Sequence, residues 1–554
     1  MASRSSTPPI RGLFRTDARA RAAYAEGAGI YRIIPRAVAR PEDVEDLTRL
    51  VSWARATATP LVPRGAGSAM GGGSVGSDVI VDLGRIGPGE VRIDPDTRTA
   101  RTGAAVTWGA LEAAAALHHL RLPPDPSSGR WATLGGMFST NASGARSVRY
   151  GSVRRWALAA ELVTADGEVV EIGRGATPSN LPAVRRVVGT IWPAISAAAP
   201  IIAERFPNTA KNSSGYALDH ALSSGDLLDL LIGAEGTLGF VTAITWRLDP
   251  IPATRASVRM SVADLQPLDD LVPALRALAP SGLELLDRSF LDVVQGSAAA
   301  RDAGIRGHEA AVLLLEFEGD DAGTVEALTR RAADLARRLG VDAVAALSAD
   351  EQRRLSALRH AASPILAGLT DRRSLQVIED ACVPIERLGA YVTAVRRITE
   401  AHGVQAVIFG HAGDGNVHVN LLPDILAAGW ERQIQAIFDE VTAAVLSLGG
   451  TPTGEHGDGR LRASVLERLY GPEIVALFRM VKAAFDPRGI LNPGIKLPLP
   501  DGEGPLAHLK VGRGAVAIPD DIAAALGEIE RGGGYARDRM EVAGGEWRVV
   551  SGEW

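Results

Sequence analysis

The chain has 554 residues, of which 46% are hydrophobic and 22% are charged. This composition is typical of a globular protein, and the chain is long enough for two or three domains. Its formal net charge of -6, without a long block of one sign, gives no electrostatic reason to expect nucleic acid or an anionic membrane as partner. The single cysteine, Cys382, excludes an internal disulfide and any iron–sulfur cluster held by the chain's own thiolates.

Short strands and an amphipathic helix are predicted in the first part of the chain. Residues 1–26 are rich in Arg, Ala and Ser, and we expect them to lie over the surface or to fray. A helix with one apolar face and acidic residues in its first turn begins at Pro41. Strands at 59–63 and 79–83 then flank a glycine-rich loop.

That loop, residues 63–76, reads PRGAGSAMGGGSVG. Glycine costs backbone entropy and contributes no side chain to packing. We therefore expect its bare N–H groups, assisted by Arg64, to converge on a diphosphate. The alternative is a flexible linker, but a linker does not usually lie between two apolar strands. A glycine-rich loop taken alone is a weak signal.

Two further loops follow in the same β-rich region. Residues 123–154 have almost no periodicity and are rich in Gly, Ser, Thr, Asn and Pro; a loop of this length is usually functional or disordered, and its flanking strands argue against disorder. In residues 231–248, Glu235-Gly236-Thr237 leads into an apolar strand. Three such loops on one region indicate a large, elongated ligand.

A β-hairpin is predicted at residues 407–423, where an Asp-Gly pair separates two β-rich runs. The period of two places His418 and Asn420 on one face of the second strand. If residues 412–415 form the loop, His411 lies diagonally across from His418. The hairpin is then half of a plausible metal site.

The other half is predicted at residues 451–462, TPTGEHGDGRLR. Glu455 completes a set of two His and one carboxylate that leaves a coordination position open for a substrate, and His456 is free to exchange protons. The alternative is that these are polar loop residues among glycines. A hydrolytic metal site fits the same residues.

Six motifs occur in one order: PRGAGS at 63–68, TLGGMFSTNASG at 133–144, GAEGTLGFVT at 233–242, HAGDGNVHVN at 411–420, GEHGDG at 454–459 and FDPRGILNPGI at 485–495. Together they resemble the FAD-linked D-2-hydroxyacid dehydrogenases. This family includes D-lactate dehydrogenase, the glycolate oxidase D-subunit and D-2-hydroxyglutarate dehydrogenase, and it has the vanillyl-alcohol-oxidase type of flavin fold.

The resemblance implies an α+β fold with a two-lobed FAD-binding domain at 27–250 and a cap domain at 251–450. The cap is expected to be an antiparallel sheet with helices on one side. Its strand candidates are 311–317, 375–378, 405–409 and 417–421, and its helix candidates are 324–339 and 385–402. Residues 451–500 return to the FAD domain with the metal Glu and the catalytic His, and residues 501–554 form a tail with a short helix at 519–531.

The resemblance also implies a set of flavin contacts. Members with a histidine just after the first glycine loop can bind FAD covalently there; Ser68 occupies that place, so we expect a dissociable FAD. Asn492 matches a residue near the flavin, although a helix-stop turn before Pro493 explains it equally well. The cofactor-binding candidates are Pro63, Arg64, Gly65, Ala66, Gly67, Ser68, Pro124, Thr133, Gly135, Gly136, Ser139, Asn141, Gly144, Tyr150, Gly236, Val241 and Asn492.

Oxidation of a 2-hydroxy acid removes a hydroxyl proton and a C2 hydride, and FAD takes the hydride. A divalent metal on His411, His418 and Glu455, with zinc expected and manganese or iron as alternatives, would stabilise the alkoxide. His456 is the expected general base, since imidazole titrates near working pH, and Asn420 would hydrogen-bond the substrate or orient a ligand.

Substrate recognition is predicted from the resemblance alone. Arg359 matches a residue that binds the substrate carboxylate, with an ordinary helix-surface arginine as the alternative. Ile378 stands where hydroxyglutarate enzymes have a lysine for a second carboxylate, which puts that specificity in doubt unless Arg372 or Arg373 substitutes.

We therefore expect an FAD-dependent dehydrogenase that oxidises a D-2-hydroxy acid to the 2-oxo acid. Without clusters of its own it must pass electrons to an external acceptor: a quinone, a cytochrome or an electron-transfer protein. No apolar run is long enough to span a bilayer, so a cytoplasmic protein is expected, with peripheral attachment to the inner membrane and a homodimer left open. The alternatives are a metal-dependent hydrolase, a non-redox flavoprotein on the same scaffold, and an oxidase.

Overall fold

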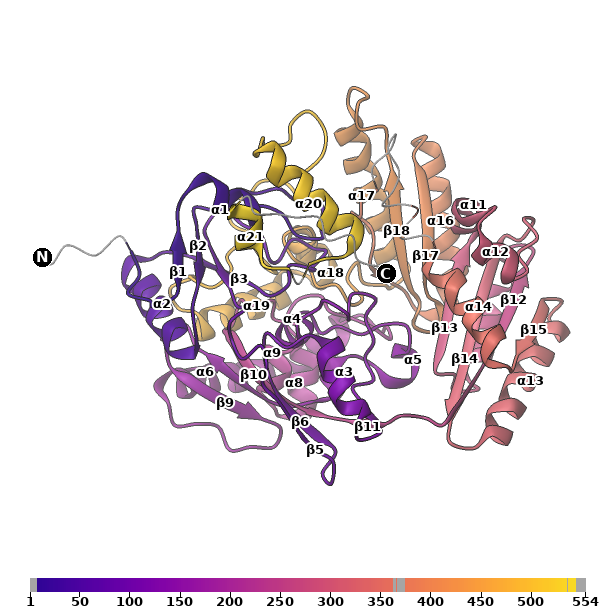
Figure 1. Ribbon diagram of the computed structural model, residues 1–554, viewed down its shortest axis with the longest axis horizontal. Helices are drawn as coiled ribbons and strands as arrows, with labels where there is room; N and C mark the ends of the chain where they lie inside the picture. The colour runs from indigo at the N-terminus through magenta and orange to yellow at the C-terminus, as the bar shows by residue number, and fades with distance from the viewer. Residues whose placement is uncertain (1–6, 362–364, 366–373, 536, 545–554) are drawn as a thin grey trace, which may run out of the picture.

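The computed structural model of the protein describes residues 7–361, 365, 374–535 and 537–544. Figure 1 shows two parts side by side: an N-terminal lobe, built from a four-stranded and a five-stranded sheet with their helices, and a seven-stranded sheet that we call the cap sheet.

The four-stranded sheet contains β1 (Leu13–Arg15), β2 (Ala37–Arg40), β4 (Val79–Asp82) and β3 (Leu61–Arg64), in that order. Helix α2 (Val44–Thr57) packs its apolar face on the sheet and begins at Asp43, whose carboxylate accepts from the Asp46 N–H. The helix and strands predicted here are confirmed.

The first 26 residues were expected to lie over the surface or to fray; of those that the structure describes, residues 13–15 instead form a strand and residues 18–23 a helix. Strand β1 pairs antiparallel with β2, and Ala20, Ala22 and Ala23 of α1 (Ala18–Ala23) are buried in an apolar cluster. Alanine carries no strong hydrophobic signal, so the burial of this segment depends on its partners rather than on its own pattern.

The five-stranded sheet is antiparallel, in the order β5 (Val91–Asp94), β6 (Thr99–Gly103), β10 (Phe240–Arg247), β8 (Ala157–Val163) and β9 (Val169–Gly173). A short pair, β7 (Leu120–Arg121) with β11 (Asp249–Pro250), follows α3 (Trp108–Ala116). The core against this sheet includes residues of α6 (Pro182–Ala197), α7 (Ala199–Arg205), α8 (Leu218–Ser224), α9 (Leu228–Leu231) and α19 (Pro472–Phe485).

In the described part of the chain no single helix is long and apolar enough to cross a membrane. Helices α6 and α7, bent by 70° between them, together reach that length and composition.

The long segment at 123–154 contains α4 (Leu134–Thr140), α5 (Ser147–Tyr150) and the 3₁₀ turn η1 (Val153–Arg155). Helices of one or two turns are too short to show a helical period in the sequence. Thr133 caps α4 by accepting from the Gly136 N–H, and Asn141 ends it in the left-handed region.

The cap sheet is antiparallel throughout, in the order β15 (Asp342–Ala346), β12 (Thr254–Val262), β14 (Ala311–Gly319), β13 (Gly282–Asp287), β17 (Gln405–His411), β18 (Asn416–Leu422) and β16 (Ala381–Cys382). The strands predicted at 311–317, 405–409 and 417–421 are confirmed. The one predicted at 375–378 is not formed: Leu375 makes an isolated bridge to Leu421, and pairing resumes at β16.

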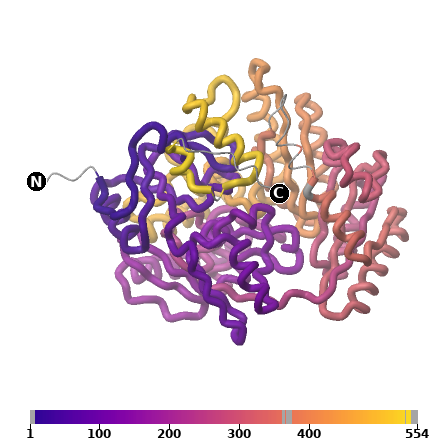
Figure 2. Tube along the Cα trace, viewed as in Figure 1, coloured from indigo at the N-terminus to yellow at the C-terminus, as the bar shows by residue number. Residues whose placement is uncertain are grey.

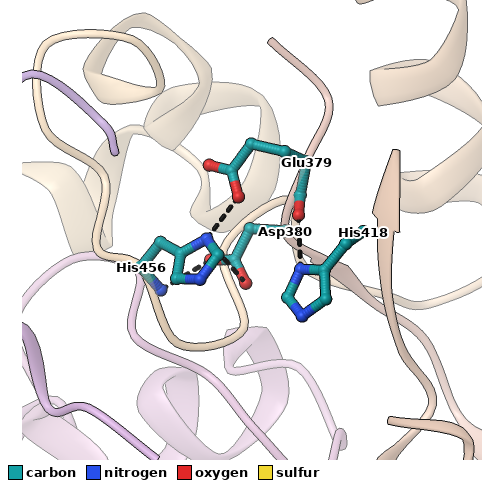
Figure 3. A group of neighbouring side chains, drawn as sticks. All are labelled: Glu379, Asp380, His418 and His456. Carbon is teal, nitrogen blue, oxygen red and sulfur yellow. Dashed lines mark hydrogen bonds and ion pairs between the residues drawn. The ribbon is translucent and has the colours of Figure 1, made fainter. Parts of the chain in front are cut away.

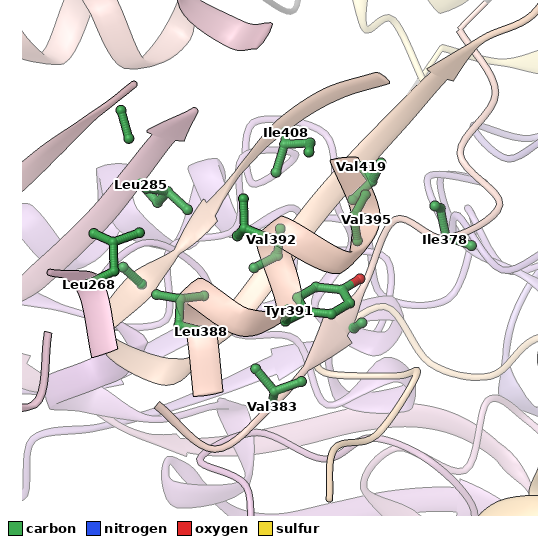
Figure 4. Packing of buried hydrophobic residues seen from close by; sticks show 14 of the residues in the cluster. Leu268, Leu285, Ile378, Val383, Leu388, Tyr391, Val392, Val395, Ile408 and Val419 are labelled. Carbon is green, nitrogen blue, oxygen red and sulfur yellow. The ribbon is translucent and has the colours of Figure 1, made fainter. Parts of the chain in front are cut away.

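Helices cover both faces of the cap sheet, whereas one covered face was predicted. On one face, α10 (Leu268–Arg276), α13 (Ala322–Arg338), α16 (Leu388–Ala401) and α17 (Trp430–Ser447) share one apolar cluster with the strands; Figure 4 shows Tyr391, Val392 and Val395 of α16 packed near Ile408 and Val419. On the other face, α11 (Arg288–Val294), α12 (Ala298–Asp302) and α14 (Ala349–His360) form a smaller cluster. The strands explain this: the neighbouring residues Leu313 and Leu314 of β14 point to opposite faces of the sheet and belong to the two different clusters. Both faces are therefore apolar and are covered by helices.

The end of the chain returns to the N-terminal lobe through η4 (Ala463–Val465), α18 (Leu466–Tyr470) and α19. The side-chain amide of Asn492 donates to the carbonyl of Gly73, 419 residues earlier, at 2.9 Å, and to that of Glu235 at 2.8 Å. Helix α20 (Asp520–Gly532), predicted at 519–531, and α21 (Arg539–Gly544) pack against α1, which Figure 2 shows as the yellow segment beside the indigo one.

Candidate active site

A cavity of about 360 Å³ lies between the three loops of the N-terminal lobe and the cap sheet. Every predicted metal-binding and catalytic residue lines it: His411, His418 and Glu455, and Arg359, Asn420 and His456. The predicted cofactor residues that also line it are Pro63, Arg64, Gly65, Ala66, Gly67, Ser68, Thr133, Gly135, Gly136, Ser139, Gly144, Gly236 and Val241. One cavity thus joins the glycine loops to the His and Glu residues.

The glycines of this wall are required by close approach. A Cβ on Gly65 would lie 2.4 Å from Thr133 Oγ1, and one on Gly236 would lie 2.2 Å from Pro63 Cγ. Gly236 also has a φ of +70°, which favours glycine over all other residues. The wall is therefore a surface of backbone and small side chains.

Arg64 contributes to the wall differently from what we predicted. Its guanidinium is buried and donates to the carbonyl of Glu26 at 2.7 Å and to those of Tyr24 and Ser74 at 3.4 Å. Burial lowers the pKa of this guanidinium. The side chain holds the loop from behind, and the loop's backbone faces the cavity.

Four predicted cofactor residues are not among those that line the cavity: Pro124, Asn141, Tyr150 and Asn492. Asn141 ends α4, and Asn492 binds two carbonyl groups of the neighbouring loops. The Tyr150 hydroxyl donates to Glu318 of β14. These polar groups support the wall.

The hairpin register brings the two histidines together. Phe409 is opposite His418 and His411 is opposite Asn416, so the two histidines are diagonal neighbours, with ring centroids 5.1 Å apart. His411 Nε2 lies 3.2 Å and His418 Nε2 3.4 Å from Glu455 Oε1. One donor atom from each of these residues lies within 4.8 Å of the others, which suits a single cation.

Both histidines are oriented through their other ring nitrogen. His411 Nδ1 is 2.6 Å from Glu284 Oε1, and His418 Nδ1 is 2.7 Å from the carbonyl oxygen of Glu379. Such partners fix the tautomer that presents Nε2 to a metal. Burial lowers the pKa of His411, but the charges of Glu284 and Glu455, with the hydrogen bond to Glu284, together raise the pKa to about 9.

The carboxylate of Glu455 is held from the N-terminal lobe. Its Oε2 accepts from Lys211 Nζ at 2.8 Å and from the Ser143 hydroxyl. Burial raises the pKa of Glu455, yet the charges of Lys211 and His411 bring it well below its ordinary value. Glu455 is therefore ionised with no cation beside it.

His456 contacts two acidic side chains (Figure 3). Its Nδ1 pairs with the Glu379 carboxylate, and its backbone N–H donates to Asp380 at 2.8 Å. Burial lowers the pKa of the ring, but the charges of Glu379 and Asp380 raise it to about 10. The ring is thus an imidazolium at neutral pH when no cation is present. Its pKa lies above the value near working pH that the sequence led us to expect.

Arg359 lies at the cap side of the cavity, with Nε 2.6 Å from Glu284 Oε2. Burial lowers the pKa of this guanidinium, but the charge of Glu284 raises it overall. Glu284 thus touches both His411 and Arg359. Ile378 is buried in the apolar cluster of the cap, and Arg372 and Arg373 lie outside the described residues.

The sequence reasoning missed Ser143, Lys211, Glu284, Glu379 and Asp380. Three of them had a signal: Glu284 interrupts the apolar run GLELL, and Glu379-Asp380 interrupt LQVIEDACV. A buried carboxylate needs a partner, so an acidic residue within an apolar run indicates a site. Ser143 and Lys211 belong to polar loops and gave no such signal.

Comparisons with known proteins agree with this geometry. Residues 35–173 match the family model described as FAD binding domain, and residues 251–495 match that described as FAD linked oxidases, C-terminal domain. The D-lactate dehydrogenase of Archaeoglobus fulgidus is 32% identical over 83% of this chain and 92% of its own length. The glycolate oxidase subunit GlcD of Bacillus subtilis is 29% identical over 84% of this chain and 89% of its own. For the D-2-hydroxyglutarate dehydrogenase of Escherichia coli the identity is 29% over 85% of this chain, but only 49% of the relative.

Solved structures share the fold at low sequence identity. A p-cresol methylhydroxylase with substrate bound has a TM-score of 0.65 at 16% identity, covering 88% of this chain and 95% of its own. The 4-ethylphenol oxidase from Gulosibacter chungangensis has a TM-score of 0.64 at 16% identity, covering 88% and 94%. The predicted α+β fold of the vanillyl-alcohol-oxidase type is confirmed.

Proposed function

Because this chain belongs to the family of FAD-linked oxidases that contains the D-lactate dehydrogenase and glycolate oxidase relatives, we propose that it oxidises a D-2-hydroxy acid to the 2-oxo acid with FAD and a divalent cation. The observation that carries the proposal is the single cavity in which a glycine-built wall faces His411, His418 and Glu455. A substrate in this cavity can contact a cofactor on the glycine-built wall and a cation at these three residues at the same time.

The glycine-built wall fits FAD. Ser74 Oγ is buried without a hydrogen-bond partner among the described residues, and Ser74 lines the cavity. We assign the elongated cofactor to the loops at 63–76, 133–144 and 235–241, held without a covalent bond because Ser68 offers no imidazole. When bound, FAD supplies the acceptor for the C2 hydrogen and its two electrons.

The cluster of His411, His418 and Glu455 fits a divalent cation. Two imidazole nitrogens and one carboxylate oxygen form the donor set of an open zinc site, and manganese or iron are alternatives. A cation held there supplies Lewis acidity toward the hydroxyl and carboxylate oxygens of the substrate. A second group of possible ligands, Glu379, Asp380, His418 and His456, lies beside it and shares His418.

The remaining residues bind the substrate and move its proton. Arg359, oriented by Glu284, binds the substrate carboxylate through charge-assisted hydrogen bonds, and the Asn420 amide hydrogen-bonds the substrate. His456 uses Nδ1 to contact Glu379 and has Nε2 left to take the hydroxyl proton. A cation bound at His411, His418 and Glu455 repels a second positive charge and so lowers the pKa of the nearby His456 ring. We therefore expect His456 Nε2 to accept a proton near neutral pH only when the cation is bound.

The electron acceptor is proposed to be external: a quinone, a cytochrome or an electron-transfer protein. The only thiol of the chain, Cys382, is buried and its Sγ–H donates to the carbonyl of Asp414. This leaves the chain without ligands for an iron–sulfur relay.

Visible absorbance of the purified protein under anaerobic conditions tests the proposal, before and after D- and L-2-hydroxy acids, with and without a chelator. We expect a D-acid such as D-lactate to bleach a flavin band, and the chelator to prevent it. A flavin band that no 2-hydroxy acid bleaches would contradict the substrate class, and bleaching unaffected by chelation would contradict the role of the cation.

A further inference from the structure

Lys211 is a buried lysine on the loop between α7 and α8, and it lies between the two stretches that match family models. Its Nζ donates to Glu455 Oε2 at 2.8 Å and to Asn416 Oδ1 at 3.2 Å, and lies 3.6 Å from Asp414 Oδ2. One side chain of the N-terminal lobe therefore binds both the hairpin turn and the segment that carries Glu455.

The two oxygens of Glu455 face different partners. Oε1 faces the imidazoles of His411 and His418, with His456 Nε2 at 3.8 Å. Oε2 faces Ser143 and Lys211, both from the N-terminal lobe. With Oε2 occupied in this way, only Oε1 is available as a ligand atom.

We propose that Lys211 is the resident counter-ion of Glu455: it binds Oε2, keeps Oε1 as the single ligand oxygen, and balances the buried charge when no cation is present. The inference rests on the proposed function, because it assumes that a divalent cation binds beside Oε1. Lys211 acts through Glu455 and is a positioning residue.

Two opposite effects follow from a lysine at this place. A buried negative charge is stabilised by an opposite charge at hydrogen-bond distance, so Lys211 stabilises the cation-free protein. Its positive charge also repels a cation at the adjacent oxygen, since like charges at short range in a protein interact strongly. Removing the charge should therefore destabilise the cation-free protein and strengthen cation binding together.

The test compares wild type with Lys211→Met, which keeps an unbranched side chain one heavy atom shorter and removes its charge. The dissociation constant for Zn²⁺ is measured by competition with a chromophoric chelator, and thermal unfolding is followed in excess EDTA and in excess Zn²⁺. We expect Zn²⁺ to bind the variant at least about 10-fold more tightly. The melting temperature should fall more in EDTA than in Zn²⁺.

Two further variants serve as controls. Lys211→Arg keeps the charge and should retain wild-type affinity. Lys510→Met removes another lysine with a mostly buried side chain, paired with Glu530 at 2.9 Å in the C-terminal segment, and should leave Zn²⁺ affinity unchanged. A purely structural lysine would give equal falls of melting temperature in EDTA and in Zn²⁺, with unchanged or weaker Zn²⁺ binding; that result would overturn the inference.

A double variant tests the charge balance without a cation. Glu455→Gln removes the charge that Lys211 balances, so Lys211→Met/Glu455→Gln should melt above Lys211→Met in EDTA, or fold where the single variant does not. A double variant no more stable than the single one would overturn the counter-ion role. Failure of wild type to bind Zn²⁺, Mn²⁺ or Fe²⁺ would overturn the cation in the proposed function, whereas normal wild-type binding with an unchanged Lys211→Met would overturn only this inference.

Discussion

The glycine loop at 63–76 and the hairpin of β17 and β18 line the same cavity, yet different forces hold them in shape. In the loop, a Cβ on Gly65 would lie 2.4 Å from Thr133 and one on Gly72 2.5 Å from Tyr31, so the glycines allow these side chains to pack directly on the backbone. Beside the hairpin, the carboxylates that contact His411 are fixed by cationic partners: Glu284 by Arg359, and Glu455 by Lys211. The loop should therefore respond to added atoms, and the hairpin to lost charges. Four substitutions test this difference.

His456→Ala should have the largest effect on activity. Loss of a general base typically lowers the rate about 10²–10⁴-fold, and the variant should retain FAD and cation because His456 is not a proposed ligand of either. Anaerobic stopped-flow absorbance of flavin reduction measures the effect. His402→Ala, which removes a histidine paired with Glu440 away from the cavity, is the matched control. Normal flavin reduction by His456→Ala would remove this residue from the mechanism.

Gly236→Ala tests the loop side of the comparison, because Gly236 packs against Pro63 at the start of the loop. The added Cβ meets Pro63 and the residue keeps a positive φ, so overpacking and backbone strain should together cost about 2–5 kcal/mol of stability or cofactor binding. The flavin-to-protein absorbance ratio and the melting temperature report it. Gly225→Ala is the control: its φ is +75° but no atom lies within 4 Å of the new Cβ, so it should keep full flavin content.

Glu318 tests what a buried ion pair contributes to stability. It joins the cap sheet to the N-terminal lobe by binding Arg121 at 2.7 Å and the Tyr150 hydroxyl. Burial raises its pKa, but Arg121 and Tyr150 bring the pKa down to about 2. A depressed folded-state pKa stabilises the protein above the unfolded value of about 4.3, and that stability is lost as the pH falls toward 2.

We expect Glu318 to contribute about 3 kcal/mol at neutral pH on this basis. Urea denaturation midpoints of wild type and Glu318→Gln should differ at pH 6 and approach each other as the pH falls to 2. A constant difference across this range would show that the contribution does not depend on ionisation.

Glu284→Gln should have the smallest of these effects, and it acts on the cation. The carboxylate that orients His411 becomes an amide, and loss of such a partner typically weakens metal affinity about 10–100-fold. Competition with a chromophoric chelator measures it. Glu318→Gln, a buried carboxylate on the adjacent strand, is the control and should bind the cation normally. Unchanged affinity in Glu284→Gln would show that His411 is oriented by other contacts.

The difference between the two regions also explains what could be predicted from the sequence. The alternation along 417–421 was enough to place His418 and Asn420 on one face and His411 on the diagonal, because the side-chain period of a strand is two. Glu455 was placed with them by the chemistry of metal ligands, and the structure brings all three donor atoms together.

Contacts between distant segments could not be predicted in this way. Lys211 meets Glu455 across 244 residues, and His411 meets Glu284 across 127, and no local pattern encodes such pairs. Arg64 shows the converse: its position in a phosphate-type loop predicted that it assists in binding a diphosphate, but its guanidinium binds the carbonyls of Glu26 and Tyr24.

The amide of Asn492 binds the carbonyl of Gly73 across 419 residues, and this separation has a consequence for biosynthesis. At about 5–20 residues per second, the ribosome needs about 20–80 s to add the residues between them. Throughout that time the first glycine loop lacks one of the segments that hold it in place. Stable flavin binding should therefore follow translation, after residue 492 has emerged.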